Sequence, residues 1–327
     1  MSELNHDEEY WELKNRFDAY YDETLKPVLQ RSESVRHRYL AAFSVLVCMG
    51  LIVYPLILIR LFNSSLNDDD TLIGVVLGLS CLVIMLLCGP LYVYKKKVKP
   101  QIMPDFANFF GSFMYQYEGK IDDMILRQSD LFGQYNLSIG DDCFTGIYDG
   151  VRICVAEEKL KLQKKDYRNT DTNTMALDTS KNVFEGVCIL FEMNKNFKGR
   201  TVVLKDMKLF NVFNRVKGLQ NIKLEDIRFE KYFEVYSDDQ IEARYLLTTG
   251  FMERMLKLRD LYDGKSIQFC FNHNTLLLAI PTKQNMFEAN SFFRSNINKK
   301  KIDLVFEQFY TIFSIVKLLK LNQKIGM

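Results

Sequence analysis

Histidine is scarce in this sequence, which limits the kinds of catalytic site that the chain can build. The 327 residues include 3 histidines, His6, His37 and His273, which stand far apart. No Ser-His-Asp or Cys-His set, no His-Glu-x-x-His motif and no glycine-rich phosphate loop can be assembled from them. The commonest ways of building an enzyme are therefore absent, although an enzyme without histidine is not excluded.

An excess of charge of one sign is also lacking, since 43 lysines and arginines face 41 aspartates and glutamates. Domains that bind nucleic acid usually carry a strong basic surplus on one face, so this kind of partner is not expected. Aromatic residues make up 13% of the chain. This content lets the polar part bury a core and argues against a disordered protein.

The seven cysteines form no recognisable framework, because no two of them are spaced as Cys-x-x-Cys. Three fall in long apolar runs and four are scattered: Cys48, Cys81 and Cys88, then Cys143, Cys154, Cys188 and Cys270. This pattern favours reduced thiols in a cytoplasmic domain over disulfides or a zinc site. We therefore expect neither a metal nor a cofactor.

Two long runs without a charged residue stand side by side near the N-terminus. One begins at Leu40 and ends at Ile59, and the other begins at Thr71 and ends at Tyr94. At about 1.5 Å per residue they reach roughly 30 and 36 Å, enough to cross the hydrocarbon core of a bilayer. The polar residues before the first run exclude a cleaved signal peptide. The sequence predicts a transmembrane helical hairpin over residues 39–95.

Charges at the ends of these runs predict the orientation of the hairpin. Basic residues precede the first run and follow the second: Arg31, Arg36, Arg38, Lys95, Lys96, Lys97 and Lys99. The short connection between the runs holds one base, Arg60, and three aspartates. Cationic flanks stay on the cytoplasmic side of a membrane. We therefore expect a multi-pass protein with both termini in the cytoplasm.

The interior of the two runs predicts an anchor. Gly74 and Gly78 lie one turn apart on one face, a spacing that lets helix backbones approach closely in lipid. Packing against the first run is the favoured use of this face, and homodimerisation is the alternative. Neither run holds an ionisable residue, which argues against a charged permeation path and makes a channel subunit the weakest hypothesis.

The rest of the chain predicts an α+β fold. Residues 1–38 form a cytoplasmic segment with an amphipathic helix over 7–29, which Pro27 bends or ends. Residues 96–327 form a cytoplasmic domain in which packed helices accompany a largely antiparallel sheet. An aromatic stripe from Phe106 to Ile125 predicts a helix that leads out from the membrane. The final helix, over 302–321, is apolar on most faces and is expected to be buried.

Three pairs of β-rich segments predict hairpins within that domain. The first turns at Asp149-Gly150, the strongest short hairpin signal. The second joins residues 183–193 to 201–204, and the third joins 266–271 to 276–280. The polar segment 164–182 has no periodicity and is expected to be a mobile loop.

One cluster of charged residues invites a catalytic hypothesis. Its members are Asp238, Asp239, Glu242 and Arg244. Three carboxylates within five residues could serve acid–base chemistry. However, Ser237 and Gln240 have the spacing of a capping box, and acids at a helix start complement the helix dipole. We favour this structural explanation and keep Asp239, Glu242 and Arg244 as candidate catalytic residues.

A second acidic group flanks the first predicted hairpin. Asp141 and Asp142 precede it, and Glu157 and Glu158 follow it. These four side chains could meet across the sheet, but nothing in the sequence requires it.

The sequence FEKYFEVYSDDQIEARYLLT at residues 229–248 resembles a bacterial family of membrane proteins known as a domain of unknown function. DDCFTG at 141–146 and FEG at 184–186 add to the resemblance, which covers roughly residues 100–285. This chain departs from the family pattern at Thr249, where relatives have proline. The resemblance implies two N-terminal spans, a cytoplasmic domain and the bacterial inner membrane. It implies no reaction, cofactor or partner.

Two functions of different class remain open. The favoured hypothesis is a non-enzymatic, membrane-anchored domain that binds a protein or lipid partner at the cytoplasmic face of the inner membrane. The alternative is a membrane-associated hydrolase or transferase that uses Asp238, Asp239 and Glu242.

Overall fold

A computed structural model describes residues 8–63, 69–164, 179–194, 196–206, 216 and 218–323. The chain separates into two compact units. We call Met1–Asn15, Ala107–Phe287 and Val305–Met327 the sheet unit, and Arg16–Phe106 with Glu288–Leu304 the hairpin unit. The predicted boundaries at residues 38 and 95 stay predictions.

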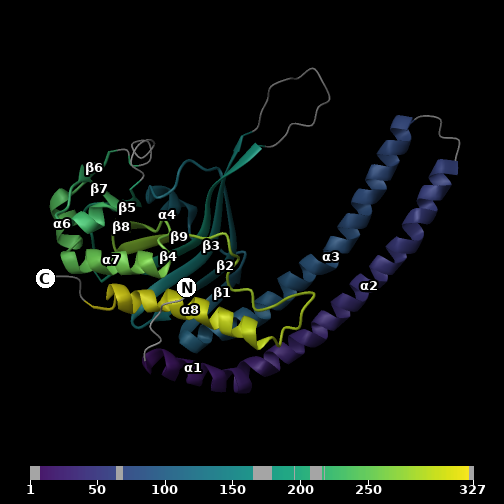
Figure 1. The fold of residues 1–327 in the computed structure, drawn as a ribbon, viewed down its shortest axis with the longest axis horizontal. Coiled ribbons are helices and arrows are strands. Elements are labelled where there is room, and N and C mark those ends of the chain that lie inside the picture. The colour runs from purple at the N-terminus through teal and green to yellow at the C-terminus, as the bar shows by residue number, and fades with distance from the viewer. Residues whose placement is uncertain are drawn as a thin grey trace. The chain divides into compact units, whose positions relative to one another are not determined.

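Two long helices form most of the hairpin unit (Figure 1). They are α2 (Lys26–Asn63) and α3 (Asp69–Phe110). Helix α1 (Glu8–Tyr20) and the π-helical turn η1 (Tyr21–Leu25) lead directly into α2. Of the two expectations for Pro27, an end of the helix was wrong, because α2 continues from Lys26 to Asn63. A bend at Pro27 stays a prediction.

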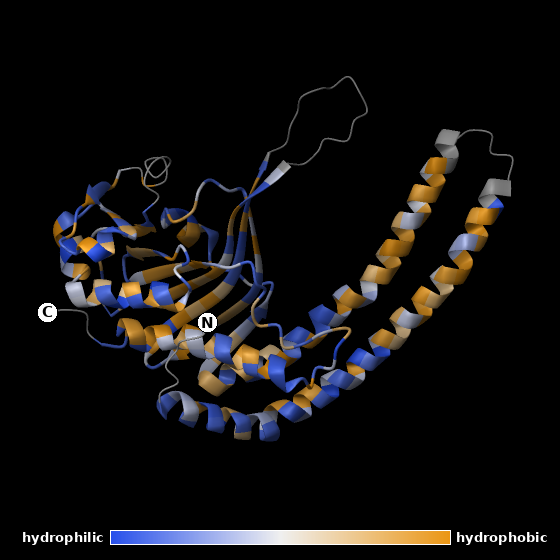
Figure 2. Cartoon of the chain, viewed as in Figure 1, coloured by the Kyte–Doolittle hydropathy of each residue, from blue (hydrophilic) through white to orange (hydrophobic). Residues whose placement is uncertain are grey.

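Figure 2 shows that hydrophobic residues predominate in α2 and α3 along the predicted spans. In the most apolar 18-residue stretch of each helix, none of the residues is buried. Leu51 is 72% exposed and Met85 is 75% exposed. Both helices are thus long and apolar enough to cross a membrane.

Contacts between the two helices involve other residues than the predicted glycine pair. A Cβ atom at Gly50 would meet Val83 at 4.0 Å, and the Tyr54 and Ser80 hydroxyls are hydrogen-bonded at 2.6 Å. At Gly74 and Gly78 a Cβ atom would meet no described atom within 4 Å. Packing of these two glycines against the first span and their use in homodimerisation both stay predictions.

The segment from Glu288 to Leu304 belongs to the same unit as α2 and α3. The Lys99 side chain is fully buried, and its ammonium group contacts Glu288 at 2.7 Å. The side-chain amide of Asn296, which is also buried, donates to the Ser32 hydroxyl at 3.1 Å and to the Tyr94 hydroxyl at 2.9 Å. This segment therefore joins the polar ends of the two long helices.

One antiparallel sheet organises the sheet unit, in the order β1-β2-β3-β4-β9-β8-β5-β7-β6. Its strands are β1 (Ser112–Tyr117), β2 (Leu137–Tyr148), β3 (Val151–Lys164), β4 (Thr179–Glu192), β5 (Thr201–Lys205), β6 (Gln220–Ile222), β7 (Phe233–Ser237), β8 (Gln268–Asn272) and β9 (Thr275–Pro281). The helices are α4 (Asp123–Gln128), α5 (Ile227–Glu230), α6 (Gln240–Leu246), α7 (Thr249–Leu261) and α8 (Lys299–Leu319). The predicted α+β class, with a largely antiparallel sheet, is confirmed.

Two of the three predicted hairpins are present. Tyr148 pairs with Val151 around Asp149 and Gly150, whose φ angles of 49° and 77° are those that a tight hairpin turn needs. The third hairpin joins β8 to β9 through a turn at residues 273–274. The predicted loop over 164–182 is shorter than expected, because β3 extends to Lys164 and β4 starts at Thr179; residues 165–178 lie outside the described part.

The second predicted hairpin was wrong, because β4 and β5 are strands but not neighbours. β4 pairs with β3 and β9, whereas β5 pairs with β7 and β8. The β8–β9 hairpin therefore lies between them. The connection from β4 to β5 is hydrogen-bonded to the turn of the β8–β9 hairpin. The amides of Met193 and Phe197 donate to the carbonyls of Asn274 and His273, each at 2.6 Å.

The predicted helix over 106–125 was also wrong beyond Phe110, where α3 ends and β1 follows. At Gly111 a Cβ atom would lie 2.7 Å from the carbonyl oxygen of Ile147. Glycine thus lets the chain approach β2 closely and change from helix to strand. In β1 the buried Phe113 lies between two exposed residues, the alternation of an edge strand.

Both faces of the sheet are covered. On one face Phe309 of α8 packs on Phe144 and Phe287 with ring centroids 5.0 and 4.7 Å apart. This confirms that the final helix is buried. On the other face Cys143, Ala156 and Cys188 belong to a cluster closed by α4 and its flanking loops, through Ile121, Leu126, Leu131 and Tyr135. Burial of these apolar groups, at about 25 cal/mol per Å², stabilises the unit.

Candidate functional site

The carboxylates of the predicted catalytic cluster lie at the start of α6. Asp239 is the N-cap, and its side chain accepts a hydrogen bond from the Glu242 amide at 2.9 Å. The expectation that Ser237 caps this helix was wrong, because the Ser237 hydroxyl instead accepts from the Asp239 amide at 3.1 Å. Arg244 is exposed and contacts none of the three carboxylates among the described residues.

The remaining carboxylates of this cluster bind the connection between β4 and β5. Glu242 accepts from the amides of Lys198 at 2.9 Å and Gly199 at 2.7 Å. Asp238 accepts from the amide of Arg200 at 2.7 Å. The Gly199 amide is half-buried and needs such an acceptor, which Glu242 supplies. The arrangement supports a structural role, and the catalytic assignment stays an untested hypothesis.

The second acidic group meets at a β-bulge. Gly140 pairs with Glu158 and Cys143 pairs with Ala156, so that two residues of β2, Asp141 and Asp142, stand opposite one residue of β3. That residue is Glu157. A bulge of this kind directs neighbouring side chains to positions that a regular strand would separate. Carboxylate oxygens of Asp141, Asp142 and Glu157 lie within 4.8 Å of one another.

Two of these carboxylates accept hydrogen bonds from neighbouring segments. The Tyr115 hydroxyl donates to Asp142 at 2.6 Å, and the Met286 amide donates to Glu157 at 2.6 Å. Burial and the negative charge of Asp142 raise the pKa of Tyr115, which keeps its hydroxyl a donor. Asp141, Asp142 and Glu157 are described residues that could hold a metal ion, and an oxygen set suits a hard cation such as Ca²⁺ or Mg²⁺.

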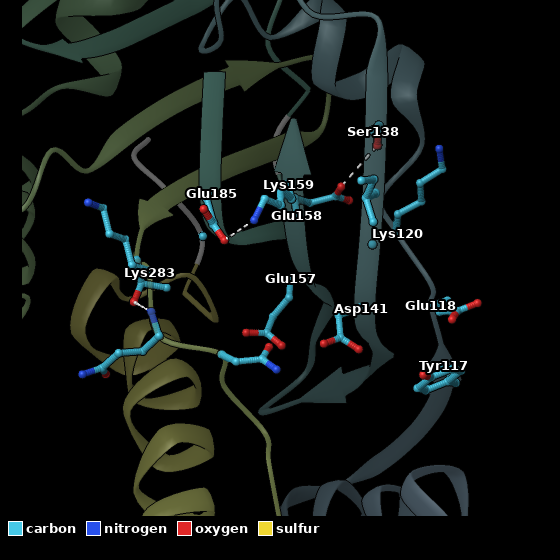
Figure 3. A pocket seen from close by; sticks show the side chains of 16 residues that line it. Tyr117, Glu118, Lys120, Ser138, Asp141, Glu157, Glu158, Lys159, Glu185 and Lys283 are labelled. Atoms are coloured by element: carbon cyan, nitrogen blue, oxygen red, sulfur yellow. Dashed lines mark hydrogen bonds and ion pairs between the residues drawn. The ribbon is translucent and has the colours of Figure 1, made fainter. Parts of the chain in front are cut away.

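A pocket of about 630 Å³ opens beside the bulge (Figure 3). It is bordered by β2, β3, the start of the β4–β9 pairing and the segment after β9. Its charged lining comprises Glu118, Lys120, Asp141, Glu157, Glu158, Lys159, Glu185 and Lys283. Five of these are acids and three are lysines, and Lys159 is paired with Glu185 at 2.7 Å. The volume falls in the range of small-ligand sites, and the surplus of acids favours a cationic group.

Glu158, which lines this pocket, has a raised pKa. Its carboxylate accepts from the Ile121 amide at 2.7 Å and from the Ser138 hydroxyl at 3.4 Å. Burial raises the pKa of Glu158 to about 7. Near neutral pH this side chain therefore exchanges a proton readily and can act as donor or acceptor.

Part of this site could have been found from the sequence. Counting back from the Asp149-Gly150 turn, residue by residue, places Asp142 opposite Glu157. The bulge that adds Asp141 has no sequence signal here. The far wall, which includes Glu185 and Lys283, depends on the pairing of β4 with β9 and could not be predicted.

No curated protein matches this chain. The crystal structure of the mycobacterial trehalose monomycolate transport factor A, TtfA, is similar over 71% of this chain and 99% of that chain, with 12% sequence identity and a TM-score of 0.36. A likeness of this size carries no argument about fold or function.

Residues 182–321 match the model of a family described as "Protein of unknown function (DUF3137)". This range includes residues 229–248, on which the resemblance mainly depends. The resemblance to a domain of unknown function is thereby confirmed over residues 182–321.

Proposed function

We propose that this protein is a membrane-anchored binding domain. In this proposal α2 and α3 cross the bacterial inner membrane, both termini lie in the cytoplasm, and the sheet unit binds a partner at the inner face. The observation that carries the proposal is the apolar surface of the two helices, in which the most apolar 18 residues include none that is buried. Such a surface in water favours aggregation, whereas lipid accommodates it.

The native cysteines test the anchor without altering the spans. Cys48, Cys81 and Cys88 are exposed on the two helices, whereas Cys143 and the other cysteines of the sheet unit are buried or half-buried. A thiol in lipid does not form the reactive thiolate. In proteoliposomes with a polar maleimide on both sides, we expect slow labelling of the native chain and complete labelling in denaturing detergent.

A matched control makes that experiment decisive. Ile227 is 86% exposed in the sheet unit, so Ile227→Cys should be labelled rapidly in the same vesicles. Labelling of Cys48, Cys81 and Cys88 at the rate of Ile227→Cys would show that the helices are in water and would overturn the proposal.

The pocket beside the β-bulge supports binding as the role of the sheet unit. Its five acids and three lysines favour a basic group of a protein partner. No observation favours the alternative of a hydrolase or transferase, since Asp238, Asp239 and Glu242 accept hydrogen bonds from backbone amides.

Site-specific crosslinking tests this assignment. With a photoreactive amino acid in place of Lys283 in the pocket lining, we expect a discrete crosslinked adduct in cells. The adduct should weaken when Asp141→Asn and Glu157→Gln are added, with unchanged circular dichroism. The same photoreactive group at Lys257, exposed on α7, should not give this adduct. An adduct that persists in the double variant would contradict binding in the pocket.

A further inference from the structure

A turn near the C-terminus, residues 291–294, lies against the beginning of the first predicted span. The ring of Phe43 in α2 contacts Phe292 and Phe293, with ring centroids 5.5 and 5.7 Å apart. Phe292 is buried, whereas Phe293 is 62% exposed. An apolar ring is thus presented to the surroundings next to a residue of the apolar run.

Hydrogen bonds fix this turn to both long helices. Arg36 of α2 donates to the carbonyl of Phe292 at 3.2 Å. Tyr94 of α3 donates to the carbonyl of Ser291 at 3.3 Å. The turn and both helices belong to the hairpin unit, so the position of Phe293 relative to the spans is defined.

The depth of the turn follows from helix geometry. Phe43 is three residues inside the run that begins at Leu40, which corresponds to about 4.5 Å along the helix axis. Phe293 therefore lies at the level where the hydrocarbon core would begin. Exposed basic side chains surround this level: Arg38, Lys96, Lys97 and Arg294. Apolar rings such as phenylalanine at the boundary between headgroups and acyl chains, with lysines and arginines beside the headgroups, are typical of an interfacial membrane contact.

We propose that the 291–294 turn is a third membrane contact, in which Phe293 inserts between the headgroups and acyl chains of the cytoplasmic leaflet. Arg294 then faces the phosphates of anionic phospholipids. This inference rests on the proposed function, because it needs α2 and α3 to be in the bilayer. It makes the 291–294 turn a lipid-binding element in addition to the two spans.

Tryptophan fluorescence tests the depth of this contact. The chain has a single tryptophan, Trp11, so the full-length Trp11→Phe chain is a silent background. In this background Phe293→Trp is reconstituted into vesicles of phosphatidylethanolamine and phosphatidylglycerol that carry bromine near the headgroup or near the chain end. We expect blue-shifted emission, with stronger quenching by the shallow bromine.

Two reference positions separate failure of this inference from failure of the anchor. Met85→Trp, in the middle of the second span, should be quenched most by the deep bromine. Ile227→Trp, exposed in the sheet unit, should not be quenched. If Phe293→Trp behaves as Ile227→Trp while Met85→Trp is quenched, the third contact is overturned and the anchor stands. If Met85→Trp is not quenched either, both proposals fail.

A second variant tests the role of the headgroup charge. Adding Arg294→Gln to Phe293→Trp should reduce the difference in quenching between vesicles with and without phosphatidylglycerol. An unchanged difference would overturn the assignment of anionic lipid as the partner of Arg294.

Discussion

Gly199 lies where the connection between β4 and β5 passes the start of α6. Because glycine has no side chain, the connection can lie close to Asp238 and Asp239. A Cβ atom at this position would lie 2.5 Å from a carboxylate oxygen of Asp238 and 2.8 Å from the Cβ of Asp239. We therefore expect Gly199→Ala to lower the free energy of unfolding by about 1–3 kcal/mol through overpacking. Thermal unfolding of the full-length protein in detergent measures this change.

The matched control is Gly250→Ala in α7, where the nearest atom to a new Cβ is an Arg254 nitrogen at 3.5 Å. Because alanine favours helix over glycine, this control should be neutral or stabilising by up to about 1 kcal/mol. Equal effects of the two substitutions would contradict the steric explanation.

Glu158 gives stability a defined dependence on pH. Burial raises its pKa from 4.5 to about 7, so the folded state holds this proton more tightly than the unfolded state. Its stabilising contribution is complete below pH 4.5 and is lost as the pH rises through about 7. The loss amounts to roughly 3 kcal/mol. Glu158→Gln, which keeps the acceptor for Ile121, should therefore gain stability relative to the native chain as the pH rises.

Unfolding curves of the two proteins in detergent, measured from acidic to mildly alkaline pH, check this prediction. Parallel dependences on pH would show that Glu158 titrates alike in both states and would contradict the assigned cause.

The position of the segment from Glu288 to Leu304 depends on one buried charge, the ammonium group of Lys99. Glu288 contacts the fully buried Lys99 at 2.7 Å and also Lys95 at 3.2 Å. Glu288→Gln leaves Lys99 without this carboxylate, and breaking a buried pair costs about 3–5 kcal/mol. Glu185→Gln, which breaks the half-exposed pair with Lys159, should cost at most about 1 kcal/mol.

Limited proteolysis within residues 288–304, together with thermal unfolding, distinguishes the two variants. Faster cleavage should appear in Glu288→Gln and not in Glu185→Gln. A variant at position 288 that is as stable as the control would indicate that Lys99 finds another acceptor.

The elements that could be predicted from the sequence are determined by residues close together in the chain. The apolar runs, the Asp149-Gly150 turn and the buried final helix each depend on residues that are adjacent or one turn apart. The position of β5 could not be predicted, because the β8–β9 hairpin that separates it from β4 comes some seventy residues later in the chain. β1 was missed for a similar reason, since its aromatic residues fit either a helix or a strand until β2 is in place.

At the scale of the whole molecule, the orientation in the membrane is open to a direct test. We expect Ser65→Cys, in the connection between the spans, to react with an impermeant maleimide added to intact spheroplasts. Ile227→Cys should react only after the membrane is permeabilised. The physical reason is the set of lysines and arginines at the other ends of the spans. Ion pairs such as Arg36 with Glu33, at 2.6 Å, do not change this expectation, because the rule depends on basic residues and not on net charge.

The opposite pattern, with Ile227→Cys labelled from outside, would place the sheet unit on the other side of the membrane. Labelling of both positions in intact spheroplasts would mean that the chain does not cross the membrane as a closed hairpin.

The pairing of Lys99 with Glu288 also has a consequence for biosynthesis. The two residues are 189 positions apart, and Lys99 is made first. At about 5–20 residues per second, the ribosome reaches Glu288 roughly 10–40 s after Lys99. During that interval Lys99 lacks the Glu288 carboxylate, so the packing around Lys99 in the second long helix is completed only after residue 288 has been made.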